Sequence, residues 1–209
     1  DFARYYDKFV RGQSTYFVWL NRGKESLVAD IKNPKDRALL KRIISKADIF
    51  IQNLLPGTLK KYALDSSTLR KKNKKLITCD ISGYGKSGTY AKNKAYDLLI
   101  QAETGLCSLT GDESSPGRVG ISVCDISCGL NAYTLILEAL IKKEKTGLGS
   151  SIEISLFDSL SEWMNVPFLQ YNYTKKAPKR VGLSHPSIVP YGCFKTKDNI
   201  NILFSIQNE

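Results

Sequence analysis

The chain has 209 residues, of which 31 are Lys or Arg and 20 are Asp or Glu, so its formal net charge at pH 7 is +11. A hydrophobic content of 42% and a charged content of 24% are ordinary for a globular protein and exclude disordered, collagen-like and disulfide-scaffold classes. A chain of this length buries roughly 70% of its unfolded surface on folding, enough for one α/β domain or for such a domain and the start of another.

Strands alternate with helices along most of the chain. Apolar runs predict strands at 26–31, 48–51, 76–81 and 152–156. Helical periodicity predicts a helix that begins at Pro34 and a long helix from Asp125 to the lysines at 142–145. Further helices are predicted at 58–62, 66–72, 96–106 and 158–171. This alternation predicts βαβ units and a parallel sheet. We expect residues 1–174 to form a large α/β domain. A basic linker at 175–180 and strands at 191–194 and 200–206 then begin a smaller, differently built domain.

The five cysteines and the single histidine predict no metal site. The cysteine count is odd, no C-x-x-C pair occurs, and one distant histidine cannot complete a zinc site. Free thiols in apolar surroundings favour a reducing compartment, so we expect a cytoplasmic protein. No apolar run of about 18 residues and no signal segment occur, which predicts no membrane span. The N-terminus lacks an initiating methionine, so we expect a fragment of a longer chain.

The string GYGKSG at 83–88 satisfies the dinucleotide-binding pattern G-x-G-x-x-G. No apolar helix opens at these glycines, and no acidic residue ends a strand about 20 positions later. The string also imitates the end of a P-loop, but Asp80 occupies the position of the required first glycine. A plain turn at a strand exit is the favoured interpretation.

Lysine-rich runs at 71–75, 142–145 and 175–180 could contact nucleic-acid phosphates. They lack interleaved aromatic residues and a known nucleic-acid module, so we interpret them as solvated helix ends and a linker, and expect no nucleic-acid partner.

A Ser-His-Asp triad would have to use His185, the sole histidine. No G-x-S-x-G elbow accompanies it, so we do not expect such a triad.

Asp125 has two interpretations. An Asp at the start of a helix is a good N-cap, and this is the simpler reading. It also follows the strand-like apolar segment 121–124, and open α/β sheets bind ligands at the carboxyl ends of their strands. A carboxylate held there could act as a nucleophile.

Six stretches, in order along nearly the whole chain, resemble the class III CoA-transferase family, which includes formyl-CoA and carnitine CoA-transferases and also α-methylacyl-CoA racemases. They are WLNRGKES (19–26) with DIK (30–32), QNLLPG (52–57), SGYG (82–85), YDLLIQA (96–102) with Gly105, TGLG (146–149) and PYGCFKTKD (190–198). The branch that the chain most resembles is the succinyl-CoA:dicarboxylate CoA-transferases. The resemblance implies a Rossmann-like large domain, a smaller α/β domain and a homodimer of interlocked rings. It also implies that the first βα unit and most of the C-terminal part are missing.

Carried over position by position, the family's catalytic aspartate falls on Asp125. The resemblance places CoA contacts on polar, basic and loop residues: Asn21, Arg22, Gly23, Lys24, Asn53, Leu54, Lys61, Lys94 and Tyr96. We also place His185 and Tyr191 on the acceptor side of the site. Because racemases carry a His-Asp pair where this chain has Tyr96 and Asp97, transfer is favoured over racemisation.

The chemistry implied is transfer of CoA from an acyl-CoA thioester to a free carboxylic acid through a covalent aspartyl intermediate. CoA is a co-substrate, and we expect no cofactor. Backbone N–H groups at the start of the helix could stabilise the oxyanion. The alternatives are an α-methylacyl-CoA racemase of the same fold and a non-catalytic phosphate-binding or nucleic-acid-binding module. The sequence does not identify the donor or the acceptor acid.

Overall fold

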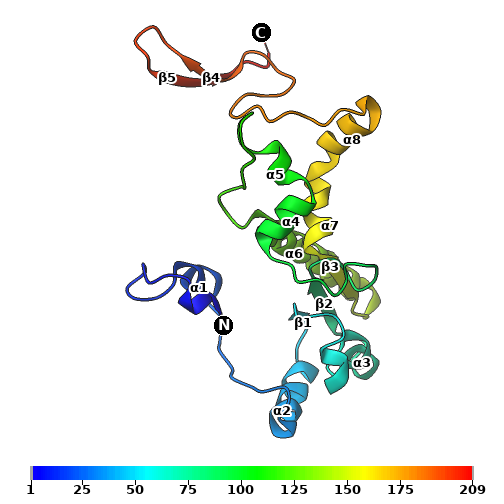
Figure 1. Cartoon of the computed structure of the whole chain (residues 1–209). Coiled ribbons are helices and arrows are strands. Elements are labelled where there is room, and N and C mark those ends of the chain that lie inside the picture. The colour runs from blue at the N-terminus through cyan, green and yellow to red at the C-terminus, as the bar shows by residue number, and fades with distance from the viewer. Residues whose placement is uncertain (1, 209) are drawn as a thin grey trace. The chain divides into compact units, whose positions relative to one another are not determined.

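The computed structural model describes residues 2–208 and divides into two units, residues 1–40 and 41–209 (Figure 1). The first unit holds a 3₁₀ turn (Phe2–Tyr5), helix α1 (Thr15–Leu20) and the start of α2 (Pro34–Ser45). The carboxylate of Asp7 accepts hydrogen bonds from the backbone N–H and the hydroxyl of Thr15, at 2.9 and 2.8 Å. This carboxylate therefore fixes the entry to α1. As predicted, Pro34 is the first residue of α2.

The strand predicted at 26–31 is wrong. Residues 24–30 have no regular structure, and a turn follows at 31 and 32. A strand exists only when its N–H and C=O groups pair with a neighbouring strand. Within residues 2–208 no strand pairs with this segment, and the side chain of Val28 is 96% exposed. The apolar pattern alone therefore does not produce a strand here.

The second unit is built on a parallel three-stranded sheet, as predicted. Its strands are β1 (Ile49–Gln52), β2 (Ile77–Ser82) and β3 (Ser151–Ser155), in the order β1-β2-β3. In the register, Ile51 lies opposite Cys79 and Cys79 lies opposite Ile152. The central strand is the most buried of the three. Its long connection to β3 contains the helices that form the candidate site.

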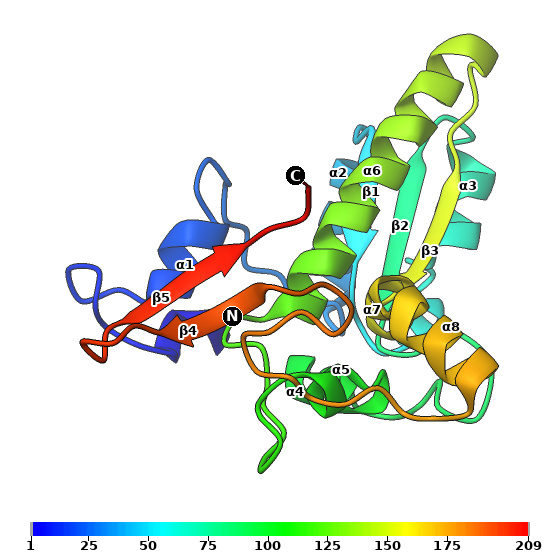
Figure 2. The same ribbon diagram turned by 90° about the horizontal axis from the view of Figure 1, so that it is seen from above.

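Helices cover both faces of this sheet (Figure 2). Alternate residues of β2 point to opposite faces. Cys79 packs against Ala132 and Ile136 of α6 (Val123–Thr146), whereas the neighbouring Asp80 bonds Ser66 of α3 (Ser66–Lys72). The arrangement therefore has three layers, with α6 on one side of the sheet and α3 on the other.

Helix α6 runs opposite to the strands. Near its C-terminal end, Lys143 forms a 2.9 Å ion pair with Asp48, which immediately precedes β1. At its other end, Val123 and Cys124 share a core cluster with Leu156 and Phe157, which immediately follow β3. The N-terminal end of α6 therefore lies at the carboxyl edge of the sheet.

The start of α6 corrects the strand-like interpretation of residues 121–124. The helix already begins at Val123, so Asp125 is its third residue, and Ser122 occupies the N-cap position without a side-chain cap bond. The predicted stop at Gly147 is confirmed, with φ +72° and an N–H bond to the carbonyl of Lys143. By length and composition α6 could also cross a membrane. One face of the helix, with Ala132, Ile136 and Ala139, packs in the sheet core, whereas Leu130, Tyr133 and Ile141 are exposed.

Two predicted helices are interrupted. The one expected at 96–106 is divided into α4 (Asp97–Glu103) and α5 (Leu106–Leu109) by Gly105, whose φ is +85°. The one expected at 158–171 consists of α7 (Leu156–Ser161), a 3₁₀ turn (Glu162–Met164) and α8 (Asn165–Thr174). A further 3₁₀ turn, Leu59–Tyr62, lies in the segment expected to be helical at 58–62.

The two C-terminal strands are confirmed as an antiparallel hairpin of β4 (Tyr191–Lys195) and β5 (Asn201–Ser205). Its preceding segment is attached to the 110–120 loop: Gly182 N–H donates to the carbonyl of Gly111, and the guanidinium of Arg180 donates to the carbonyl of Asp112 at 2.7 Å. The division into domains at 174/175 remains a prediction.

Candidate functional site

Asp125 lies in the first turn of α6, at the carboxyl edge of the parallel sheet. The residue is exposed, and within residues 2–208 its carboxylate has no hydrogen-bond or salt-bridge partner. Desolvation by the surrounding protein and the negative charge of Asp97 both raise the pKa of Asp125. A carboxylate that is accessible, unpaired and more basic than usual is suited to attack an electrophile.

Most backbone N–H groups in the first turn of α6 already donate hydrogen bonds within the chain. Few of them are therefore free to stabilise an oxyanion. Three N–H groups already donate within the chain: Val123 to the carbonyl of Ile121 (2.8 Å), Cys124 to Oδ1 of Asp97 (2.8 Å) and Ile126 to the carbonyl of Ser122 (3.0 Å). For residues 2–208 this leaves the N–H of Asp125 itself as the unpaired amide of the first turn. A group of several oxyanion donors is therefore not present at this helix start.

A cavity of about 1040 Å³ opens on the α3 side of the same sheet edge. Residues of β1, β2 and β3, the loop at 54–57 and helix α3 line it. Both signs of charge occur in the wall: the lysines and the arginine lie on α3 and in the turns and loops, and the carboxylates lie on β2, β3 and α7 and before α3. Leu54 is the only predicted CoA contact among its lining residues, and Asp125 is not one of them.

Strands β2 and β3 carry an ion cluster in this cavity that the sequence did not indicate. The carboxylate of Asp80 on β2 accepts hydrogen bonds from Lys86 (2.9 Å), Ser66 (2.8 Å) and Gln52 (3.0 Å). Lys86 also contacts Glu153 of β3 at 2.7 Å. The favoured interpretation of the glycine-rich segment is therefore refined: it is a turn after β2 whose lysine folds back onto two strand carboxylates.

Two opposing effects set the pKa values in this cluster. Desolvation acts to raise the pKa of Asp80, but the hydrogen bonds from Lys86, Gln52 and Ser66 outweigh it, and the net pKa is lowered. Desolvation acts to lower the pKa of Lys86, but its hydrogen bonds to Glu153 and Asp80 raise the net pKa. The cluster is thus charged at neutral pH.

The other predicted CoA contacts lie on several exposed segments. In the second unit, Asn53 follows β1, Lys61 is in a 3₁₀ turn, and Lys94 and Tyr96 immediately precede α4. In the first unit, residues 21–24 (Asn21, Arg22, Gly23 and Lys24) form the turn after α1. Tyr96 immediately precedes Asp97, whose carboxylate accepts a hydrogen bond from the first turn of α6.

His185 and Tyr191 are in contact with each other. Their rings stack with centroids 5.1 Å apart, and His185 N–H donates to the carbonyl of Tyr191 at 3.1 Å. Nδ1 of His185 accepts the N–H of Ser187, so the neutral ring carries its proton on Nε2. The role of the pair at the acceptor side remains a prediction.

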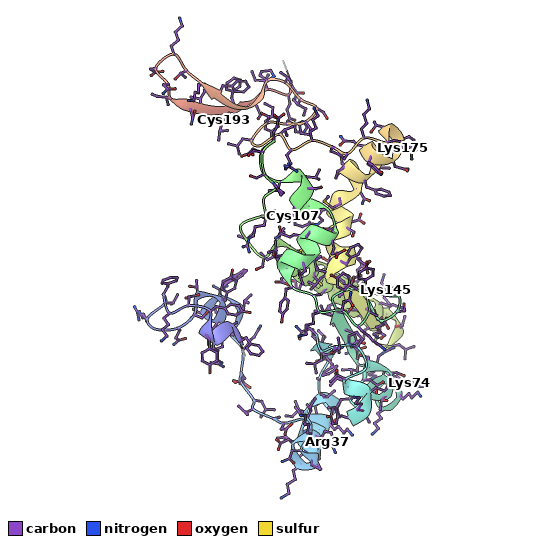
Figure 3. The ribbon with its side chains drawn as sticks, viewed as in Figure 1. Arg37, Lys74, Cys107, Lys145, Lys175 and Cys193 are labelled. Atoms are coloured by element: carbon purple, nitrogen blue, oxygen red, sulfur yellow. The ribbon has the colours of Figure 1, made fainter. Side chains whose placement is uncertain are left out.

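Figure 3 labels residues from several of the remaining sequence features. Lys145 lies in the last turn of α6 and Lys175 follows α8, which agrees with the interpretation of the basic runs as helix ends. Cys107 on α5 and Cys193 on β4 lie on separate elements, and all five cysteines are free thiols. Within residues 2–208, no group of three His, Cys, Asp or Glu side chains is arranged to hold a metal.

The fold and the site together define a parallel α/β protein with an unpaired carboxylate at the carboxyl edge of its sheet. The model of CoA-transferase family III matches residues 1–209, and the chain belongs to this family. The resemblance noted in the sequence is thereby confirmed, and the protein is a CoA-transferase homologue by sequence along its whole length.

Curated relatives and a solved structure agree with this assignment. The acetyl-CoA:oxalate CoA-transferase of Acetobacter aceti is 36% identical over 95% of this chain and 51% of its own length. The succinyl-CoA:glutarate CoA-transferase of Homo sapiens is 36% identical over 96% of this chain and 46% of its own length. A CAIB/BAIF family protein from Brucella suis is 36% identical, with a TM-score of 0.84 over 92% of this chain and 51% of that one. The chain spans about half the length of the curated relatives it matches.

Proposed function

We propose that this chain is part of a longer enzyme that transfers CoA from an acyl-CoA thioester to a dicarboxylic acid, with Asp125 as the covalent nucleophile. The observation that carries the proposal is the carboxylate of Asp125, which is accessible, has no partner within residues 2–208 and has a raised pKa at the carboxyl edge of the sheet. Relatives named as oxalate and glutarate CoA-transferases support a dicarboxylate as the acceptor.

The reaction begins when the Asp125 carboxylate attacks the thioester carbonyl and expels CoA thiolate, forming a mixed anhydride. The thiolate then attacks the anhydride at the Asp125 carbonyl, which releases the donor acid and leaves an aspartyl-CoA thioester. The acceptor carboxylate attacks that thioester and again expels the thiolate. In the last step the thiolate attacks the acceptor carbonyl, so that the acceptor-CoA thioester forms and the Asp125 carboxylate is regenerated. Each step exchanges one activated acyl bond for another.

The residues around Asp125 support the first step. Desolvation and Asp97 raise the basicity of the carboxylate, and the unpaired N–H of Asp125 can stabilise negative charge on an adjacent oxygen. Lys24, Lys61 and Lys94 carry positive charges for the phosphates of CoA, and all three are exposed. We place the CoA contacts on the predicted residues and the acceptor near His185 and Tyr191.

The family resemblance also implies an assembly and a complete fold for the longer enzyme. We propose that it is an interlocked homodimer, that its large domain is completed as a Rossmann-like fold, and that it works in the cytoplasm with CoA as co-substrate and no cofactor. Tyr96 supports transfer over racemisation, because a two-base exchange of the α-proton needs a second base where this tyrosine stands.

The test is substitution in the full-length parent enzyme. Asp125→Asn is expected to lower CoA transfer from succinyl-CoA to glutarate or oxalate by at least about 1,000-fold, because an amide cannot form the anhydride. Asn53→Ala, which changes only a predicted CoA contact, serves as the matched control and is expected to change mainly KM. Transfer at the wild-type rate in Asp125→Asn would rule out the covalent mechanism. Deuterium wash-in at the α-carbon without acyl exchange would identify a racemase instead.

A further inference from the structure

Asp97 and Gln101 form a polar connection between helix α4 and the first turn of α6. Oδ1 of Asp97 accepts the backbone N–H of Cys124 at 2.8 Å, and Oδ2 accepts Nε2 of Gln101 at 2.7 Å. Oε1 of Gln101 accepts the N–H of Val119 at 2.9 Å. The thiol of Cys124 also donates to the carbonyl of Asp97 at 3.3 Å. Nε2 of Gln101 donates, in addition, to the carbonyl of Val119 at 3.5 Å. Five contacts thus join α4, the end of the 110–120 loop and the residue immediately before Asp125.

The use of Asp97 is not that of an ordinary residue in a first helical turn. An acidic side chain at this position usually interacts with the free amides of its own helix. Both oxygens of Asp97 are instead committed to other partners, one of them on α6, 27 positions along the chain. Asp97 is therefore oriented by α6 and by Gln101.

Gln101 makes this orientation rigid. Its side chain is fully buried, so its amide group has no water to exchange partners with. The oxygen receives the N–H of Val119, which forces the amine to face the Asp97 carboxylate. Reversing the amide would place two donors against each other at Val119. One arrangement of the three groups is therefore strongly preferred.

An arrangement selected only for stability would not place charge here. A partly buried carboxylate and a fully buried amide cost desolvation free energy that apolar side chains would not. Asp97 also sets a second negative charge beside Asp125, which, together with desolvation, raises the pKa of Asp125. Asp97 and Gln101 are therefore better explained by an effect on Asp125 than by a contribution to stability.

We propose that Asp97 is a positioning residue for Asp125: braced by Gln101, it clamps the backbone of Cys124 and so holds the nucleophilic carboxylate in one orientation during acyl transfer. This inference rests on the proposed function, because it assigns Asp97 a role in the same reaction. Asp97 exchanges no proton or acyl group in it.

The hydrogen-bond pattern defines a rescue experiment in the full-length parent enzyme. In Asp97→Asn, the amide oxygen can still accept from Cys124, but the amine faces the amine of Gln101. In the double variant Asp97→Asn with Gln101→Glu, the new amine faces a carboxylate, which can also accept the N–H of Val119. The double variant therefore restores the bond between positions 97 and 101 and keeps the acceptor for the N–H of Val119, but it loses the 3.5 Å bond from Nε2 of Gln101 to the carbonyl of Val119. It also moves the negative charge from position 97 to position 101. Glu103→Gln removes a charge from an exposed position of α4 and is the matched control.

We expect Asp97→Asn to lower kcat about 10- to 100-fold, because small displacements of a reacting group have effects of this size. KM for the acyl-CoA should change less than about threefold, since Asp97 does not bind CoA in this account. The acidic limb of the kcat profile should move to lower pH, because removal of the Asp97 charge lowers the pKa of Asp125. The double variant should recover most of the rate, and Glu103→Gln should match the wild type.

A kcat for Asp97→Asn within about twofold of the wild type would overturn the positioning role. A slow single variant that the double variant fails to improve would also overturn it. If Asp97→Asn does not fold, Gln101→Met removes the bonds of Gln101 to Asp97 and to Val119 but leaves the bond from Cys124 to Asp97, and an unchanged kcat there equally contradicts the proposal. Asp125→Asn, measured in parallel, separates the two proposals. Transfer by that variant refutes the proposed function, whereas its loss together with a normal Asp97→Asn refutes only the role of Asp97.

Discussion

The ion cluster of Asp80, Lys86 and Glu153 allows a stability prediction worked from its geometry. In Asp80→Asn, the amide oxygen can still accept from Gln52 and Ser66, but the amine faces Lys86. The change therefore removes one charge-assisted hydrogen bond of 2.9 Å, to a carboxylate whose side chain is 8% exposed. Such a bond contributes about 1.5 to 3 kcal/mol. For a chain of this size the melting temperature should fall by roughly 3 to 10 °C.

Thermal unfolding followed by circular dichroism measures this difference, with Glu153→Gln as the matched control. Glu153 contacts the same lysine at 2.7 Å, but its side chain is 57% exposed. An exposed ion pair contributes about 0 to 1 kcal/mol, so the control should shift the melting temperature by no more than roughly 3 °C. The contrast isolates the effect of burying the carboxylate.

The pH dependence follows from the lowered pKa of Asp80. A carboxyl group whose pKa is lower in the folded state contributes stability at pH values above its unfolded pKa, near 4, and loses it as the pH falls through the folded pKa. The gap between the wild type and Asp80→Asn should therefore be full at pH 7 and narrow below about pH 4. Equal shifts for Asp80→Asn and Glu153→Gln, or a gap as large at pH 3 as at pH 7, would refute the reasoning.

Two substitutions and one labelling experiment test packing, helix stability and thiol exposure. Gly149→Ala drives its new methyl group into the backbone carbonyl of Leu76 and should lower the unfolding free energy by about 1 to 3 kcal/mol in denaturant titration; an unchanged midpoint contradicts this. In Gly129→Ala, the new methyl group meets no atom within 4 Å, and the position lies in the interior of α6. The free energy of unfolding should therefore rise by about 1 kcal/mol, because Ala favours a helix more than Gly does, and a destabilised variant contradicts this. The methyl group lies one turn after the nucleophile and should lower the activity. Iodoacetamide at pH 8 should label the exposed Cys193 first, because burial raises the pKa of Cys124 to about 12; labelling of Cys124 without unfolding contradicts this.

The sequence was most informative where one physical signal dominated. Pro34 and Gly147 fix helix ends through their backbone preferences, and both positions are as predicted. The apolar runs of β1, β2 and β3 predicted a parallel sheet because the intervening segments are long enough for helical crossovers. These features depend on local chemistry, which a single sequence contains.

The predictions from sequence failed where the local structure depends on a segment that is distant in the sequence. The segment at 26–31 has a strand pattern, but no strand pairs with it within residues 2–208. Residues 121–124 are too short for periodicity to separate a strand from a helix, and the amide of Cys124 joins α6 because Asp97 provides it with an acceptor. The same contact explains why the position of Asp125 was found whereas its support was not. Asp97 and Gln101 are only four residues apart, but their partners at 119 and 124 are set by the tertiary fold.

The chemical state of Asp125 during turnover tests the central claim most directly. The full-length parent enzyme is mixed with succinyl-CoA, quenched within the first turnover, digested and examined by mass spectrometry, with Asp125→Asn treated in the same way. We predict a peptide containing Asp125 that carries one CoA through a thioester and disappears when glutarate is added. Rapid CoA transfer with no adduct on this peptide, or an adduct on another residue that persists in Asp125→Asn, would contradict the account.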